Sequence, residues 1–102
     1  MKYNSHMKSK CYIFFETLST KLKIDIVDQL REKSFTVNEL SKQLKQERSK
    51  VSHALLSLKE CGFVNAKKDG KKRIYSLNKE TILPLLKLIE KHVKKYCKIC
   101  NK

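Results

Sequence analysis

Apolar residues recur at the three- and four-residue spacing of helices through the first two thirds of the chain. This pattern predicts helices over about 10–18, from residue 22 to near Lys33, over 39–44 and over 48–61. Residues 35–37 are predicted to form a short strand, and Asn38 is expected to cap the third helix. Gly62 follows the fourth helix, where a left-handed residue commonly ends a helix.

Two short runs, residues 63–68 and 71–77, predict a β-hairpin around Asp69-Gly70. A two-residue type I′ turn favours this dipeptide because both of its central residues need a positive φ. The pairs expected in that register are Lys68 with Lys71 and Lys67 with Lys72. The apolar face expected at the base of the hairpin consists of Val64, Ala66, Tyr75 and Leu77. The cationic tip lacks countercharge, which phosphates can supply.

A last helix is predicted after Asn78 or Thr81, either of which can cap it, with Pro84 in its first turns. Its apolar stripe consists of Ile82, Leu85, Leu86, Ile89, Val93, Tyr96, Cys97 and Cys100. This helix is longer than so small a domain can cover, and the first helix is apolar on two sides. Both helices are therefore expected to contact a second subunit.

Charge and composition limit the classes of function. The 102 residues form one domain by length, and only two Gly and one Pro predict a mainly helical chain. The formal charge is +14, from 24 Lys and Arg against 10 Asp and Glu, which favours a polyanionic partner. No run of about 18 apolar residues and no signal peptide are visible, so we expect a cytoplasmic protein without a membrane partner.

The outer face of the predicted helix over 48–61 is small and polar near its N-terminal end, which suits a helix that enters the major groove. We therefore predict that the protein binds duplex DNA through this helix and through the hairpin over 63–77. The predicted DNA-binding residues are Arg48, Ser49, Lys50, Ser52, His53, Lys67, Lys68, Lys71, Lys72 and Arg73. A basic module that binds RNA or a protein partner is the alternative. No phosphate-binding glycine loop and no nucleophile with a recognisable base are visible, so we expect no enzymatic activity.

Four short segments carry a resemblance to a known family. They are Val37-Asn38-Glu39-Leu40, Val51-Ser52-His53-Ala54-Leu55, Leu58-Lys59-Glu60-Cys61-Gly62-Phe63-Val64 and Lys72-Arg73-Ile74-Tyr75-Ser76-Leu77. With them, the stretch over 18–78 resembles the ArsR-type winged-helix repressors. The resemblance implies a winged helix-turn-helix fold and a homodimer joined through its N- and C-terminal helices, which binds a palindromic operator as a repressor.

The resemblance also places the parts of the chain. The domain is expected over 10–97, with its terminal helices forming the dimer interface, between a flexible N-terminus over 1–9 and a tail over 98–102. The residues assigned to the interface are Phe14, Phe15, Leu86, Ile89, Val93 and Tyr96.

The chain departs from the family at its cap and at its sensing residues. Glu47 stands where the family usually places a Ser or Thr cap. The helix over 39–44 lacks the family's metal-sensing cysteine pair, and His92 stands alone at the family's C-terminal metal site. The family's metal-sensing mechanism is therefore not expected here.

The cysteines leave three alternatives open. Thiols three residues apart can share a zinc ion when two further ligands are present, as in Cys97-Lys98-Ile99-Cys100. The candidate zinc ligands are Cys11, Cys97 and Cys100. The second alternative is that the cysteines form a redox-responsive pair, and the third is that they have no special role. No cofactor other than zinc is expected.

Overall fold

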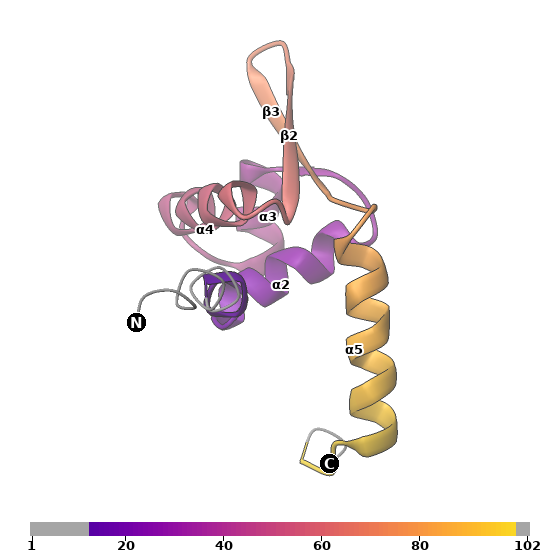
Figure 1. Cartoon of the computed structure of the whole chain (residues 1–102). Coiled ribbons are helices and arrows are strands. Elements are labelled where there is room, and N and C mark those ends of the chain that lie inside the picture. Colours follow the sequence, from indigo (N-terminus) through magenta and orange to yellow (C-terminus); the bar gives the residue numbers. More distant parts are fainter. Residues whose placement is uncertain (1–12, 100–102) are drawn as a thin grey trace, which may run out of the picture.

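A computed structural model describes residues 13–99, in which a small antiparallel sheet packs against helices at its base and projects from them as a hairpin (Figure 1). The elements in chain order are a helical segment over 13–17, α2 (Lys21–Leu30), β1 (Phe35–Thr36), α3 (Val37–Leu44), α4 (Arg48–Glu60), β2 (Val64–Asp69), β3 (Lys72–Leu77) and α5 (Ile82–Tyr96). Strand β3 lies between β1 and β2 and pairs antiparallel with both. The mainly helical fold with a small hairpin is confirmed, and the strand predicted over 35–37 is present as β1.

One apolar core joins α2, α3, α4 and the base of the hairpin. Its largest fully buried side chains are Phe63, Ile26, Leu30, Leu40, Leu55, Leu58, Val51 and Val64. The inward face predicted for α4 is confirmed, since its buried residues are Val51, Ala54, Leu55 and Leu58. Each large buried side chain stabilises the fold by about 1.5–3 kcal/mol. Burial of this face fixes the rotation of α4 and leaves its opposite face in solvent.

Thr36 caps α3, and the prediction of Asn38 as the cap is wrong. Thr36 is extended (φ −87°, ψ 169°), and its hydroxyl accepts a hydrogen bond from the Glu39 amide at 3.2 Å. The Glu39 carboxylate accepts one from the Thr36 amide at 2.8 Å, which completes a capping box and lowers the pKa of Glu39. The T-x-x-E spacing favours Thr36 over Asn38 as the cap, because only a cap at Thr36 places a glutamate where its carboxylate can accept a hydrogen bond from the amide of the cap residue.

Removing the cap tests this assignment. We expect Thr36→Ala to lower the free energy of unfolding by about 1 kcal/mol, because the Glu39 amide loses its acceptor. Asn38→Ala is the matched control: Asn38 lies inside the helix, so alanine leaves stability unchanged or raises it slightly through its higher helix propensity. Urea unfolding measures both variants, and a larger loss for Asn38→Ala contradicts the assignment.

A turn of three residues joins α3 to α4. Lys45 is left-handed (φ 55°), and the Gln46 amide donates to the Ser41 carbonyl at 3.1 Å. The Ser41 hydroxyl donates in return to the Gln46 carbonyl at 2.5 Å. Gly62, with φ 79°, follows α4 and its C-cap Cys61, as predicted. Helices α3 and α4 therefore form a helix-turn-helix with defined ends.

The hairpin turns one residue later than predicted. Asp69 faces Lys72, so the central residues of the turn are Gly70 and Lys71. Gly70 has a φ of 65° whereas the φ of Lys71 is not positive, which is the pattern of a type II′ turn with glycine first. The predicted type I′ turn is wrong because it needs a positive φ at Asp69 as well, and only glycine adopts that φ without cost.

The new register changes the pairs at the tip but not the two faces. The predicted pairs Lys68–Lys71 and Lys67–Lys72 are wrong: Lys68 faces Arg73, and Lys67 faces Ile74. Every partner moves by two positions, an even number, so no side chain changes face. The predicted apolar face is therefore confirmed as Val64 opposite Leu77 and Ala66 opposite Tyr75.

The first residue of helix α5 is Ile82, and Thr81 occupies its N-cap position without a capping hydrogen bond from its side chain. Pro84 is the third helical residue, where its missing N–H removes no bond of the helix. At Asn78, the alternative cap, the side-chain amide donates to the Gly62 carbonyl at 2.9 Å, and the side-chain oxygen accepts from the Glu80 amide at 3.1 Å. The helix leaves the body on the side opposite the hairpin tip (Figure 1). Among the described helices, none is both long and apolar enough to cross a membrane.

Candidate nucleic-acid interface

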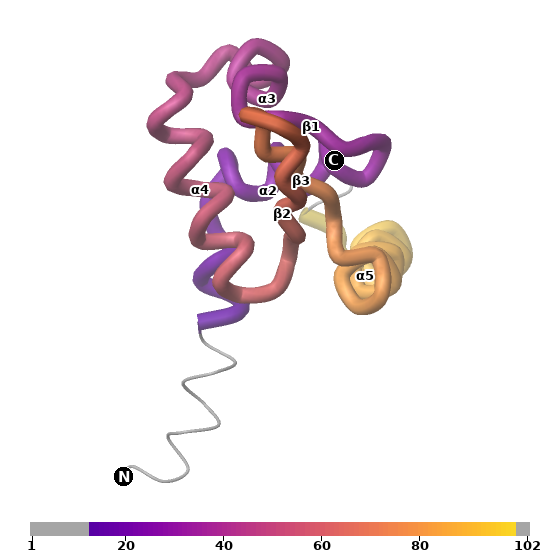
Figure 2. Tube along the Cα trace, turned by 90° about the horizontal axis from the view of Figure 1, so that it is seen from above, coloured from indigo at the N-terminus to yellow at the C-terminus, as the bar shows by residue number. Residues whose placement is uncertain are grey.

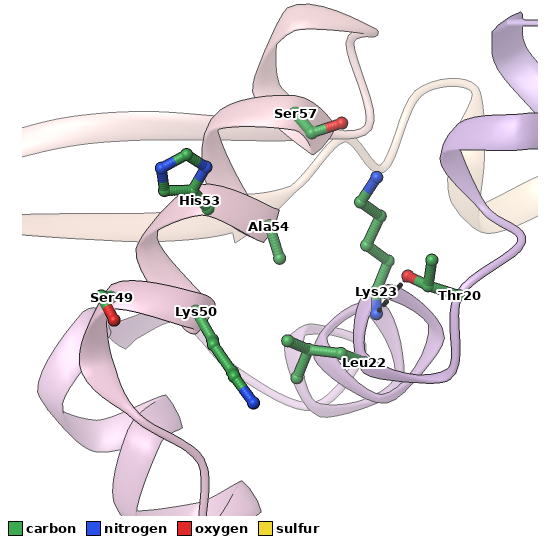
Figure 3. A pocket seen from close by; sticks show the side chains of 8 residues that line it. All are labelled: Thr20, Leu22, Lys23, Ser49, Lys50, His53, Ala54 and Ser57. Atoms are coloured by element: carbon green, nitrogen blue, oxygen red, sulfur yellow. Dashed lines mark hydrogen bonds between the residues drawn. The ribbon is translucent and has the colours of Figure 1, made fainter.

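Five of the residues predicted to bind DNA lie on α4, with Ser49 and His53 on its outer face and Lys50 on the side towards α2 (Figure 3). Arg48, Ser49, Lys50, Ser52 and His53 are exposed. Figure 3 shows Ala54 and Lys50 directed across to α2, with His53 and Ser49 on another side of the helix. Leu56 lies on the same outer face and is 54% exposed. Glu47 occupies the N-cap position without a capping hydrogen bond from its side chain, as expected of a poor cap.

A hollow of about 610 Å³ extends this face to the start of α2 (Figure 3). Its lining consists of Thr20, Leu22, Lys23, Ser49, Lys50, His53, Ala54 and Ser57. The lining holds two lysines and no acid, so the hollow suits an anionic group. Sequence reasoning missed Thr20 and Lys23. Thr20 caps α2 by accepting from the Lys23 amide at 3.4 Å, and a Thr before an apolar periodic run is a signal that could have placed it there.

The hairpin carries the other five predicted residues. Lys67, Lys68, Lys71, Lys72 and Arg73 are all exposed. Val64, Tyr75 and Leu77 anchor its base in the core, and β1 pairs with β3 there. Within residues 13–99, none of these five cations forms an ion pair within 4.0 Å. A buried base therefore supports a projecting tip that carries five cations and one acid, Asp69, which faces Lys72.

The two predicted surfaces are joined through one buried segment. Strand β2 begins four residues after α4 ends, and Phe63 between them is fully buried. Figure 2, seen from above, shows α4 on one side of the hairpin base and α5 on the other. The hairpin and α4 therefore share a rigid base, and α5 lies apart from both.

The residues predicted for a dimer interface differ in how far the structure exposes them. Phe14 stacks on Phe63 at 4.8 Å between ring centroids, and Leu86 packs against the core, so both contact their own domain. Val93 is half-buried. Phe15 and Tyr96 are 65% and 64% exposed, and Ile89 is 40% exposed. Leu88, which was not predicted, is 64% exposed on α5. The described chain thus leaves large apolar side chains open at both ends.

The cysteines do not gather into a site within the described residues. Cys61, half-buried, lies with its Sγ 3.1 Å from the Thr17 hydroxyl, and Cys97 is half-buried at the C-cap of α5. Cys11 and Cys100 lie outside the described residues, as do the predicted N-terminus over 1–9 and the last three residues of the tail. Residues 13–99 hold no group of three side chains able to bind one metal ion.

A helix-turn-helix followed by a hairpin anchored in its core defines a winged helix-turn-helix DNA-binding protein. Residues 20–66 match the model of the family described as "Bacterial regulatory protein, arsR family". Over 79 residues the chain is 37% identical to the uncharacterized HTH-type transcriptional regulator Rv0081 of Mycobacterium tuberculosis, covering 76% of this chain and 69% of that protein. The chain therefore belongs to the ArsR family of bacterial winged helix-turn-helix transcriptional regulators, which are not enzymes in general.

Solved structures agree with this assignment. The crystal structure of Rv0081 from M. tuberculosis matches with a TM-score of 0.79 at 32% identity, covering 87% of this chain and 89% of that chain. The transcriptional repressor BigR from Xylella fastidiosa matches with a TM-score of 0.69 at 25% identity, over 95% and 98%. The homodimeric winged helix-turn-helix DNA-binding domain Mb0332 from Mycobacterium bovis, described as a possible ArsR-family regulator, has a TM-score of 0.82 at 18% identity, over 94% and 89%, and supports the fold alone.

Proposed function

We propose that this chain is a homodimeric repressor that acts in the cytoplasm on a palindromic operator in duplex DNA. Helix α4 enters the major groove, and the hairpin β2–β3 lies along the neighbouring phosphates or minor groove. The observation that carries the proposal is the exposed polar face of α4 joined, through one buried base, to a hairpin whose tip carries five cations and one acid.

The shape and chemistry of α4 support its place in the groove. The major groove is about 12 Å wide, and short side chains such as Ser49 and Ser52 allow the backbone of a helix to approach the bases. His53 can hydrogen-bond base edges, and the exposed Leu56 offers an apolar contact that suits a thymine methyl group. Arg48 and Lys50, near the N-terminus of the helix, can reach phosphates.

The hollow beside α4 supports a second track of backbone contacts. Lys23 and Lys50 line it from α2 and α4, and Thr20 adds a hydroxyl group (Figure 3). A phosphate held there lies beside the helix that contacts the bases. Phosphate contacts fix the position of a protein on the duplex without selecting a sequence.

The apolar side chains at the two ends of the described chain support a dimer. Leu88, Ile89 and Tyr96 on α5 and Phe15 near the start of the chain are exposed in the single subunit. Three large apolar side chains left exposed on one helix favour an interface with another protein. Mb0332 is described as homodimeric, and BigR as a repressor, which is consistent with both parts of the proposal.

Titration against three nucleic acids tests the proposal. Genomic fragments that the protein selects are compared with a random duplex of equal length and with a structured RNA. We expect the selected duplex to bind about 10³-fold or more tightly than the random duplex. Preference for the RNA, or no binding to any of them, contradicts the proposal and favours a module for RNA or for a protein partner.

His53→Ala tests the role of α4 in selecting the operator. We expect the affinity for the selected duplex to fall by about 5- to 150-fold, which corresponds to about 1–3 kcal/mol for a good base contact, while affinity for the random duplex changes little. Glu60→Ala is the matched control, since Glu60 is exposed on the same face at the far end of the helix. An equal loss on both duplexes shows that His53 contacts phosphate rather than bases.

A further inference from the structure

Helix α5 contacts the winged domain mainly through its first turns. Ile82 is buried, and Leu83 and Leu86 pack against the core. Beyond Leu86 the helix leaves the body, with Leu88 and Ile89 exposed (Figure 1). Apolar packing therefore fixes the base of α5 and leaves its direction to fewer contacts.

An open hollow of about 810 Å³ lies beside the base of α5. Arg31 of the α2 end, Gln43 of α3, and Leu83 and Lys87 of α5 are among the residues that line it. Side chains do not fill this space, so close packing does not hold α5 at one angle against α2 and α3.

A two-bond ion pair connects α5 to α2 beside this hollow. The Arg31 guanidinium donates to both carboxylate oxygens of Glu90, at 2.5 Å and 3.1 Å. Arg31 is the C-cap of α2, directly after the buried Leu30, and its guanidinium also lies 3.8 Å from the Asp28 carboxylate. The hydrogen bond with Glu90 raises the pKa of Arg31, and the one with Arg31 lowers the pKa of Glu90.

We propose that Arg31 and Glu90 are positioning residues that fix the angle of α5 against the winged domain and so set the half-site spacing that the dimer accepts. The inference rests on the proposed homodimer, in which α5 carries the partner. A helix of 15 residues is about 22 Å long, so a tilt of about 10° at its base moves its far end by about 4 Å. That shift is close to the rise of one base pair, about 3.4 Å.

The chemistry of the pair suits an orienting role. Exposed ion pairs contribute little to folding stability. A two-bond arginine–carboxylate pair nevertheless imposes a defined geometry, because both N–H groups must meet both oxygens. Glu90 lies one turn beyond Leu86, the last residue of α5 that packs against the core. Because it is further from the base of α5, a contact there limits the tilt of the helix more strongly than another contact at the base.

Operators with altered spacing test the inference. Two copies of the selected half-site are placed at the natural spacing and at 1 and 2 base pairs more or less. We expect the wild type to favour one spacing by at least 10-fold over a change of 2 base pairs. In Glu90→Ala, the ratio of the affinity at the preferred spacing to the affinity at a spacing changed by 2 base pairs falls to about 3-fold or less. Circular dichroism and sedimentation should show that this variant remains a folded dimer. The exchanged pair, Arg31→Glu with Glu90→Arg, should recover at least half of the lost spacing preference, measured on a logarithmic scale. The recovery is partial because Asp28 then repels the carboxylate introduced at position 31.

Asp25→Ala is the matched control, because it removes an exposed ion pair of similar length, Lys21–Asp25 at 2.9 Å, that lies within one helix. It changes the net charge by the same amount and should leave the spacing ratio as in the wild type. A wild-type ratio retained in Glu90→Ala overturns the inference and leaves the proposed function intact. A wild type that binds every spacing equally contradicts the two-half-site function itself.

Discussion

Raising the salt concentration from about 50 to about 200 mM is expected to lower the affinity for the operator by about 10³- to 10⁵-fold, if six to ten phosphates are neutralised per dimer. The reason is the release of counterions by cations that meet the DNA backbone. The chain carries a formal charge of +14, and the five hairpin cations have no ion pair within residues 13–99. Fluorescence anisotropy at several potassium chloride concentrations gives the slope of log affinity against log salt.

The hairpin's share of this slope is measured with Lys67→Gln combined with Lys72→Gln. These two lysines lie on the same face of the hairpin, since Lys67 faces Ile74 and Lys72 faces Asp69. We expect the variant to weaken binding to all duplexes alike and to reduce the slope by about 4 in a dimer, close to one per lysine.

The matched control removes two exposed lysines that lie outside the proposed DNA interface. Lys91→Gln combined with Lys98→Gln changes the net charge equally, near the C-terminal end of the described chain. It should alter the slope by less than 1. If the control and the hairpin variant behave alike, the cations act through net charge, and the hairpin does not contact DNA.

A charge placed on the exposed apolar side of α5 is expected to separate the subunits. Ile89→Glu puts a carboxylate beside Leu88 in the proposed interface, where its desolvation is costly. We expect a monomer at micromolar concentration and a loss of operator affinity of about 10²- to 10⁴-fold, because the second half-site then no longer binds within one molecule. Analytical ultracentrifugation and an operator titration measure the two effects.

Lys94→Glu is the control for an introduced carboxylate. By the 3.6-residue period of a helix, Lys94 lies on the side of α5 away from Ile89, Leu88 and Tyr96, and it is exposed. It should remain dimeric with nearly unchanged folding stability. Operator affinity that persists in monomeric Ile89→Glu contradicts the proposed dimer.

Periodicity and turn chemistry predicted most of the fold because local rules govern those elements. The inward face of α4, the end of that helix at Gly62 and the two faces of the hairpin all follow from side-chain spacing and from glycine geometry. The errors lie at element ends, where alternatives differ by a few residues; α2, predicted to end near Lys33, ends at Leu30. Thr36 prevailed over Asn38 through a reciprocal bond, and Gly70 took the first place in its turn.

Contacts between elements far apart in the sequence could not be predicted in this way. The outer face of α4 was found from one helix alone, but the hollow that adds Thr20 and Lys23 depends on how α2 crosses α4. Likewise, Arg31 and Glu90 are 59 positions apart, and no local pattern in the sequence pairs them. Only the tertiary arrangement brings them together.

Hydroxyl-radical footprinting on a selected genomic fragment tests the central claim most directly. The account predicts two protected segments with related sequences, their centres about 10 base pairs or a multiple of it apart. It also predicts weaker protection on the outer side of each segment. This flanking protection disappears in the Lys67→Gln/Lys72→Gln variant, while both main segments stay protected. A single protected segment, or flanking protection that survives the loss of both lysines, would contradict the account.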